Sequence, residues 1–105
     1  MAVIVPSDAI ETRKMTEYIT DYEGPVYMRI NKESLPLIFN EKWEFELGKL
    51  YEVRKGNDAV VFANGIMVSK ALSAASLLEK EDISIKVMNV STVKPLNKEE
   101  IIEIL

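Results

Sequence analysis

The chain has 105 residues, a formal net charge of −4 and a hydrophobic fraction of 48%. This length suits one ordinary domain or parts of two small ones, and the composition excludes an intrinsically disordered chain. The sequence has no basic stripe, no apolar run near the roughly 18 residues that span a bilayer, and no signal-peptide pattern. We therefore expect no binding to nucleic acid or membrane. The absence of cysteine fits a reducing cytosol, so we expect a cytoplasmic protein.

The missing residue types also limit the chemistry of this chain. Because it has no histidine and no cysteine, it supplies neither an imidazole base nor a thiolate nucleophile. A serine hydrolase triad is excluded, and a structural zinc site would have to rely on carboxylates alone. Any catalysis by this chain would use Asp, Glu, Lys, Tyr or Arg side chains.

The first 30 residues predict a strand, a helix and a second strand. Residues 2–5 form an apolar run, Asp8 is placed to cap a helix, and Glu11 follows at the capping-box spacing. Gly24-Pro25 ends this helix, and residues 26–30 read as the second strand. Two strands joined by a helix through short connections indicate a parallel βαβ unit. Capping explains the two acidic residues more simply than a pair of catalytic carboxylates does.

A polar connection separates this unit from the rest of the chain. Residues 31–42 are rich in polar residues and include Pro36, which marks a candidate domain boundary. Apolar and acidic residues then alternate from Trp43 to Leu47, which indicates a strand that continues toward Val53.

The second half predicts another α/β series. Residues 59–63 form a continuous apolar strand, typical of a central strand that is buried on both faces. Asn64-Gly65 turns the chain into a helix over residues 66–79, and a strand follows at about 83–90. Pro95 closes the loop after that strand, and Asn97 then begins a last, short helix. The abrupt strand at one end and the short helix at the other lead us to expect a segment of a larger protein.

The order and spacing of these segments resemble the C-terminal part of transketolase, and more narrowly the C-terminal subunit of split bacterial and archaeal transketolases. The matching pieces, which together cover essentially the whole chain, are VPSDAIE, GPVYMR, ELGK, ANGIMVSKALSAASLL and VMNVSTVKPL. The resemblance implies an α/β fold of two partial three-layer units with mostly parallel strands. Residues 1–32 would end the pyrimidine-binding domain, residues 33–46 would form the connector, and residues 47–105 would begin the transketolase C-terminal domain.

The resemblance also implies a function. Such enzymes use thiamine diphosphate and Mg²⁺ to move a two-carbon ketol unit between sugar phosphates, as in the pentose phosphate pathway. The family's cofactor-contacting glutamate lies upstream of Met1, and nothing here matches the Gly-Asp-Gly to Asn segment that holds the diphosphate and the metal. We therefore expect no catalytic residue and no cofactor or metal site in this chain alone. It would need a transketolase N-terminal subunit or the missing remainder, and would form a homo-oligomer such as a dimer.

One substrate contact is expected to remain. In the family, a basic residue shortly after the GPVYMR strand contacts the substrate phosphate, and alignment places Lys32 there. Many relatives carry arginine at this position, whereas lysine offers a point charge without the bidentate fork. The alternative is a solvated loop lysine. Arg29 is a second candidate for the phosphate contact. For Arg29 we favour the alternative that it is partly buried and paired with a nearby carboxylate.

Other functions stay open. Within the same superfamily, 1-deoxyxylulose-5-phosphate synthase and the beta subunit of 2-oxoacid dehydrogenases share the domain order. A non-catalytic interaction module is the alternative of another class, because exposed apolar surface left by missing strands would drive association.

Overall fold

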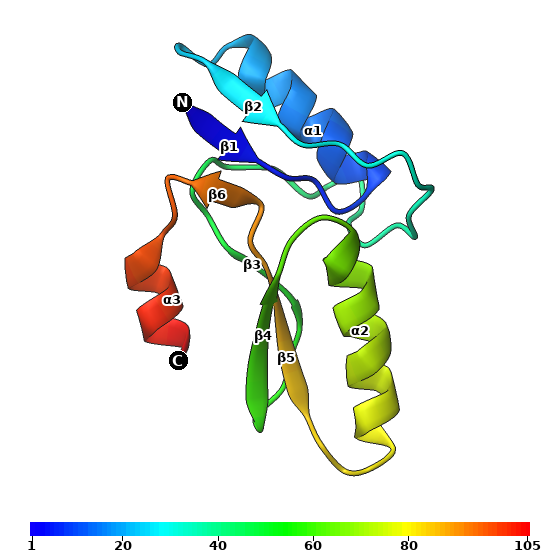
Figure 1. The fold of residues 1–105 in the computed structure, drawn as a ribbon. Coiled ribbons are helices and arrows are strands. Elements are labelled where there is room, and N and C mark those ends of the chain that lie inside the picture. The colour runs from blue at the N-terminus through cyan, green and yellow to red at the C-terminus, as the bar shows by residue number, and fades with distance from the viewer.

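The computed structural model describes all 105 residues as two three-stranded sheets and three helices (Figure 1). The expected α/β class is therefore confirmed. None of the three helices combines the length and the apolar character that crossing a membrane requires. In chain order the elements are β1 (Ala2–Ile4), α1 (Ala9–Thr20), β2 (Val26–Met28), β3 (Tyr51–Arg54), β4 (Ala59–Ala63), α2 (Ile66–Glu79), β5 (Ile85–Asn89), β6 (Thr92–Lys94) and α3 (Lys98–Ile104).

The first sheet has the strand order β2-β1-β6. β1 pairs parallel with β2, which confirms the predicted βαβ unit, and it pairs antiparallel with β6. Asp8 caps α1 as expected, because its carboxylate accepts a hydrogen bond from the Glu11 backbone N–H at 2.6 Å. β6 lies in the segment for which the sequence predicts a loop. It is three residues long and its partner lies far away in the chain, so no local pattern reveals it.

The second sheet has the order β3-β5-β4, with β4 parallel and β3 antiparallel to β5. The prediction that residues 59–63 form a central strand is wrong, because β4 lies at the edge of the sheet and its Val61 is 37% exposed. Helices explain the apolar run. α2 packs over one face of the sheet at Ala75, Ile85 and Val87, and α3 packs over the other. On the α3 side, Val60 and Phe62 of β4 pack with Ile101 and Ile104, whereas Ala59 and Val61 on the opposite face of β4 are exposed.

The segment 43–47 forms no strand, which corrects the interpretation of its alternating pattern. The pattern arises because every second side chain of an irregular segment turns into the core of the first unit. Phe45 is buried there, and Trp43 packs beside it. The other buried members of this core are Ile4, Met15 and Tyr51. Burial raises the pKa of Tyr51 to about 12, while its hydroxyl accepts a hydrogen bond from the Glu46 N–H.

The two sheets meet where the chain leaves β5 and enters β6 (Figure 1). Only Val90 and Ser91 separate these strands, so one stretch of backbone belongs to both sheets. The backbone N–H of Val5 donates to the carbonyl of Ser91 at 2.8 Å, which ties the carboxyl end of β1 to this crossing. The seam between the sheets therefore brings together residues from the two ends of the chain.

Candidate functional site

Four polar side chains gather at the seam, and we call them the Glu11 cluster: Ser7, Glu11, Asn89 and Ser91. Ser7 and Glu11 come from the turn after β1 and the first turn of α1, whereas Asn89 ends β5 and Ser91 lies just beyond it. All four are fully buried. Buried polar side chains are tolerated only when they find hydrogen-bond partners, so their contacts decide what the cluster does.

The carboxylate of Glu11 is the acceptor at the centre of this cluster. Its Oε1 accepts from the Ser7 backbone N–H at 2.7 Å and from the Ser7 hydroxyl at 2.8 Å. The Asn89 amide nitrogen donates to both carboxylate oxygens at 3.1 Å, and the Ser91 hydroxyl donates to Oε2. The Asn89 amide oxygen has no partner. Glu11 thus joins the two sheets through donors on both sides of the seam.

Burial raises the pKa of Glu11 above its ordinary value of 4.5, and the hydrogen bonds from Ser91, Ser7 and Asn89 oppose that shift. The capping prediction is confirmed for Asp8, but it misses this second role of Glu11. The partners of Glu11 lie near the other end of the chain, so helix periodicity could not reveal them. The available signal for this role was the pair of polar residues Asn89 and Ser91, which stand on either side of Val90 at the end of an apolar strand.

Asp8 also uses both of its carboxylate oxygens. Besides capping α1 through Oδ1, it accepts through Oδ2 from the backbone N–H groups of Ile38 and Phe39, at 2.6 and 2.8 Å. It therefore fastens the polar connection to the start of the helix. No group of three or more His, Cys, Asp or Glu side chains converges in this structure in a way that could hold a metal ion. The two buried carboxylates are occupied by protein donors.

A polar recess of about 290 Å³ opens at the carboxyl ends of β1 and β2, where parallel strands of α/β proteins commonly present ligand sites. Asp8, Asn31, Glu33 and Ser34 contribute polar groups to its lining. Lys32 lies in the chain between two of these lining residues, is exposed, and belongs to none of the ion pairs of the structure. It is the one basic residue between Ile30 and Leu35, the stretch that lines this recess.

Arg29 does not match its favoured interpretation. It is exposed and forms none of the ion pairs, so the prediction of a partly buried arginine paired with a carboxylate is wrong. The reason is topological. β2 is an edge strand of the first sheet, and Arg29 follows its last residue, where no neighbouring element supplies a carboxylate.

Asn64-Gly65 forms a close-packed turn between β4 and α2. Gly65 caps α2 without a side-chain hydrogen bond, and its φ of 57° lies in the left-handed region that favours glycine. A Cβ at this position would come within 3.0 Å of the Val5 side chain. The glycine therefore lets the second unit approach the end of β1. A simple strand-to-helix turn explains Asn64-Gly65 without a ligand site.

Comparisons with known proteins agree with this architecture. The family model "Transketolase, C-terminal domain" matches residues 48–105. The 6-deoxy-6-sulfo-D-fructose transketolase subunit SqwH of a Clostridium species is 39% identical over 102 residues, covering 97% of this chain and 32% of that protein. A subunit of the apulose-4-phosphate transketolase of Phocaeicola vulgatus is 34% identical over 102 residues, covering 96% of this chain and 33% of that protein.

A solved structure shares the same fold over nearly the whole chain. It is described as a split gene transketolase, inactive beta4 tetramer, and it superposes with a TM-score of 0.94 at 38% identity. The match covers 98% of this chain and 34% of that one. The chain therefore spans about a third of the length of these relatives.

Proposed function

This chain belongs to the transketolase family, and on that premise we propose that it is part of an enzyme that moves a two-carbon ketol unit between sugar phosphates. The observation that carries the proposal is the family match over residues 48–105, which is supported by the fold shared with a split gene transketolase. In this proposal residues 1–32 end the pyrimidine-binding domain, residues 33–46 connect, and residues 47–105 begin the C-terminal domain. Thiamine diphosphate, when bound to the whole enzyme, supplies the carbanion chemistry.

The two buried carboxylates of this chain do not fit Mg²⁺. Mg²⁺ prefers oxygen ligands in octahedral geometry, and the buried carboxylates of Asp8 and Glu11 already accept hydrogen bonds from the protein. We therefore assign cofactor binding to another polypeptide, an N-terminal subunit or the remainder of a longer protein. The contribution of this chain would be packing between subunits and one contact to substrate.

Lys32 is the residue proposed for that contact. It is exposed, free of ion pairs, and placed beside the recess at the ends of β1 and β2. The Asn31 and Ser34 side chains in the recess offer neutral donors, whereas Glu33 and Asp8 carry negative charge. A phosphate near these carboxylates needs a compensating cation, and Lys32 is the basic residue within the stretch 30–35 that lines the recess.

The experiment grafts this chain into the equivalent segment of a split transketolase C-terminal subunit, and assays it alone and with the matching N-terminal subunit. Activity that appears only on mixing supports the proposal. In the active complex we expect Lys32→Ala to lower kcat/KM for a sugar phosphate by roughly 10- to 100-fold, the effect of losing one charged hydrogen bond. For hydroxypyruvate, a ketol donor without a phosphate, the same variant should leave kcat/KM unchanged.

Two variants sharpen this result. Lys32→Arg should retain most of the activity, because arginine also pairs with phosphate. Lys42→Ala is the matched control, since Lys42 is another exposed lysine of the connection without an ion pair. An equal loss for both substrates with Lys32→Ala would refute the phosphate contact. A folded graft that stays inactive with the N-terminal subunit would refute the enzymatic proposal.

A further inference from the structure

Of the two carboxylates that line the polar recess, Asp8 is the buried one, with 3% of its surface exposed. Its Oδ1 accepts a hydrogen bond from the Glu11 N–H at 2.6 Å and so caps α1. Its Oδ2 accepts from the N–H groups of Ile38 and Phe39, at 2.6 and 2.8 Å. Three backbone donors thus compensate the burial of one charge. The same side chain therefore fastens the start of α1 to the far end of the loop that carries Lys32.

This loop is held by hydrogen bonds at its two ends only. At its start, the Arg29 N–H donates to the Ile4 carbonyl at 3.0 Å, which continues the pairing of β1 with β2. At its end are the two bonds to Asp8. Residues 30–37 lie in no helix or strand and form no backbone–backbone hydrogen bond, and in Figure 1 the chain here passes around the first turn of α1. A stretch without such bonds follows the course that its ends impose.

The recess lies between this loop and the start of α1. One wall consists of loop residues on both sides of Lys32, and the other consists of residues 6–12, which include Asp8. Because Asp8 bonds to the end of the loop, it joins the two walls. If this bond were lost, the loop wall and Lys32 with it would be free to move away from α1. A phosphate contact depends on such placement, since a hydrogen bond weakens steeply when its geometry is lost.

We propose that Asp8 is a positioning residue, which holds Lys32 at the recess by fixing the far end of its loop to the start of α1. The inference rests on the proposed function, because it requires Lys32 to contact the substrate phosphate. It deepens that function by naming the group that places the lysine. The Phe39 ring also stacks on Trp43, with ring centroids 4.1 Å apart. That contact holds the side chain beyond the loop, whereas Asp8 supplies the bond to α1.

Asp8→Asn separates the two roles of this side chain. The amide oxygen can still accept from the Glu11 N–H, and asparagine caps helices as well as aspartate does. The amide nitrogen that replaces Oδ2 is a donor, so it cannot accept from Ile38 and Phe39. The variant should therefore keep the helix and release the loop. Asp8→Ser is a second variant with the same purpose, because serine caps helices but has a single oxygen.

Hydrogen–deuterium exchange measures this release directly, in the complex of the grafted subunit with the N-terminal subunit. In Asp8→Asn we expect the amides of Ile38 and Phe39 to exchange at least about tenfold faster, while the amides of α1 keep their rates within about twofold. Asp58→Asn is the matched control. The Asp58 carboxylate accepts from the Ser84 N–H at 2.6 Å, and Asp58 does not line the recess. This control should leave the exchange of residues 30–39 unchanged.

Kinetics in the same complex show whether the released loop affects the substrate. Asp8→Asn should raise KM for a sugar phosphate by about 3- to 30-fold and leave kcat within about twofold, because the phosphate contact acts on binding in the ground and transition states alike. With hydroxypyruvate and an acceptor without phosphate, kcat/KM should not change. In a Lys32→Ala background, Asp8→Asn should alter kcat/KM by less than about twofold, since the lysine on which it acts is gone.

The outcomes separate this inference from the proposed function. If Lys32→Ala has no effect on the sugar phosphate, the phosphate contact is refuted and the positioning role with it. If Lys32→Ala has its expected effect but Asp8→Asn and Asp8→Ser leave KM unchanged, the contact stands and the positioning role alone is overturned. Unchanged exchange at Ile38 and Phe39 would also overturn it. So would equal effects of Asp8→Asn with and without Lys32, because Asp8 would then act through another group.

Discussion

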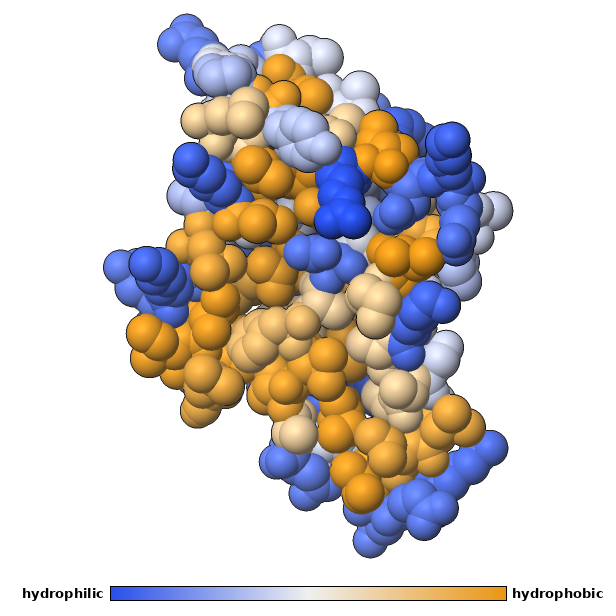
Figure 2. Space-filling model, in the orientation of Figure 1, coloured by the Kyte–Doolittle hydropathy of each residue, from blue (hydrophilic) through white to orange (hydrophobic).

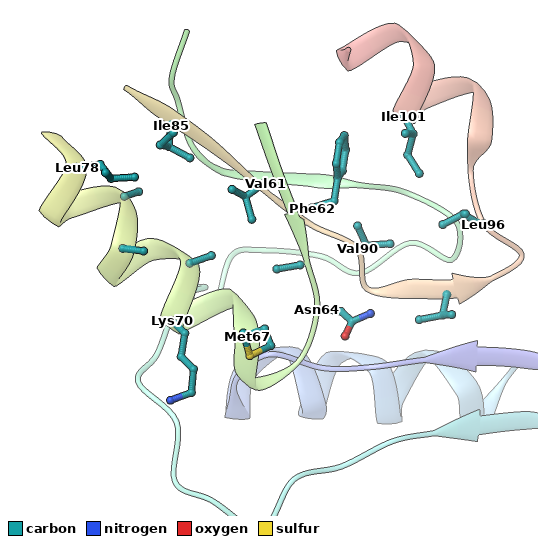
Figure 3. Close-up of a pocket in the computed structure, with 15 residues that line it drawn as sticks. Val61, Phe62, Asn64, Met67, Lys70, Leu78, Ile85, Val90, Leu96 and Ile101 are labelled. Atoms are coloured by element: carbon teal, nitrogen blue, oxygen red, sulfur yellow. The ribbon is translucent and has the colours of Figure 1, made fainter. Parts of the chain in front are cut away.

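The seam between the two sheets is closed by polar contacts, whereas a groove beside β4, between α2 and α3, is lined by apolar side chains (Figure 3) and is open to solvent (Figure 2). At the seam, the Glu11 carboxylate receives donors from both sheets, so its burial is compensated within the chain. In the groove, Val61 of β4 is 37% exposed and Met67 of α2 is 54% exposed. The seam thus buries polar groups that have partners, whereas the groove exposes apolar groups that have none.

The difference shows where this chain is self-sufficient. The polar seam needs the geometry of its four side chains, and one chain supplies all of them. The apolar groove has no such contacts within the chain, and its side chains stay partly exposed. Changes at the seam should therefore lower the free energy of unfolding more than changes in the groove.

The largest effect is expected when the acceptor of the seam is removed. Glu11→Ala leaves the buried donors of Ser7, Asn89 and Ser91 without an acceptor, and should lower the free energy of unfolding by about 3 kcal/mol or more. Glu17→Ala, an exposed glutamate of the same helix, should change it by less than about 0.5 kcal/mol. Urea unfolding followed by circular dichroism measures both values. Similar losses in the two variants would show that the Glu11 cluster does not hold the sheets together.

A pair of methionines compares the core with the groove directly. Met15 is fully buried beside Ile4, so Met15→Ala should cost about 2–5 kcal/mol through the cavity that it leaves. Met67 is half exposed in the groove, and Met67→Ala should cost less than about 1 kcal/mol. Both are measured by urea unfolding followed by circular dichroism. Equal costs there would mean that the groove is part of the core of the single chain.

The smallest expected effect is a change with pH. Because burial raises the pKa of Glu11, the unfolded chain releases this proton near pH 4.5 while the folded chain still holds it. The contribution of this group to stability is complete below pH 4.5 and is lost as the pH rises through the folded pKa. Glu11→Gln cannot titrate, so its stability does not carry this pH dependence. Its stability relative to the natural chain should therefore rise as the pH increases above about 4.5 in urea unfolding, and parallel curves would contradict the shift.

Much of the local structure could be predicted because its signals are local. The helix over residues 66–79 and the cap at Asp8 follow from periodicity and from side chains that bond within one turn. The parallel pairing of β1 and β2 follows from the short connections around α1. The Asn97 cap of α3 is confirmed for the same reason, since its side chain accepts from the Glu100 N–H.

The rest depends on residues that meet from distant parts of the chain. β6 and the Glu11 cluster bring residues 89–94 against the turn after β1, which no spacing rule encodes. The alternation at 43–47 resembles a strand, yet packing around Phe45 explains it without one. Lys32 stays a prediction, although its place beside the polar recess comes from the fold.

By itself, the sequence determined the three helices, most of the strands and which family the chain resembles, because periodicity, caps and ordered motifs act over short distances. Only the tertiary structure decided that β4 lies at the edge of the sheet β3-β5-β4, since an apolar run does not report which edges of a strand are paired. It also decided that Glu11 joins the two sheets, because a buried carboxylate is stable only where donors from both ends of the chain converge.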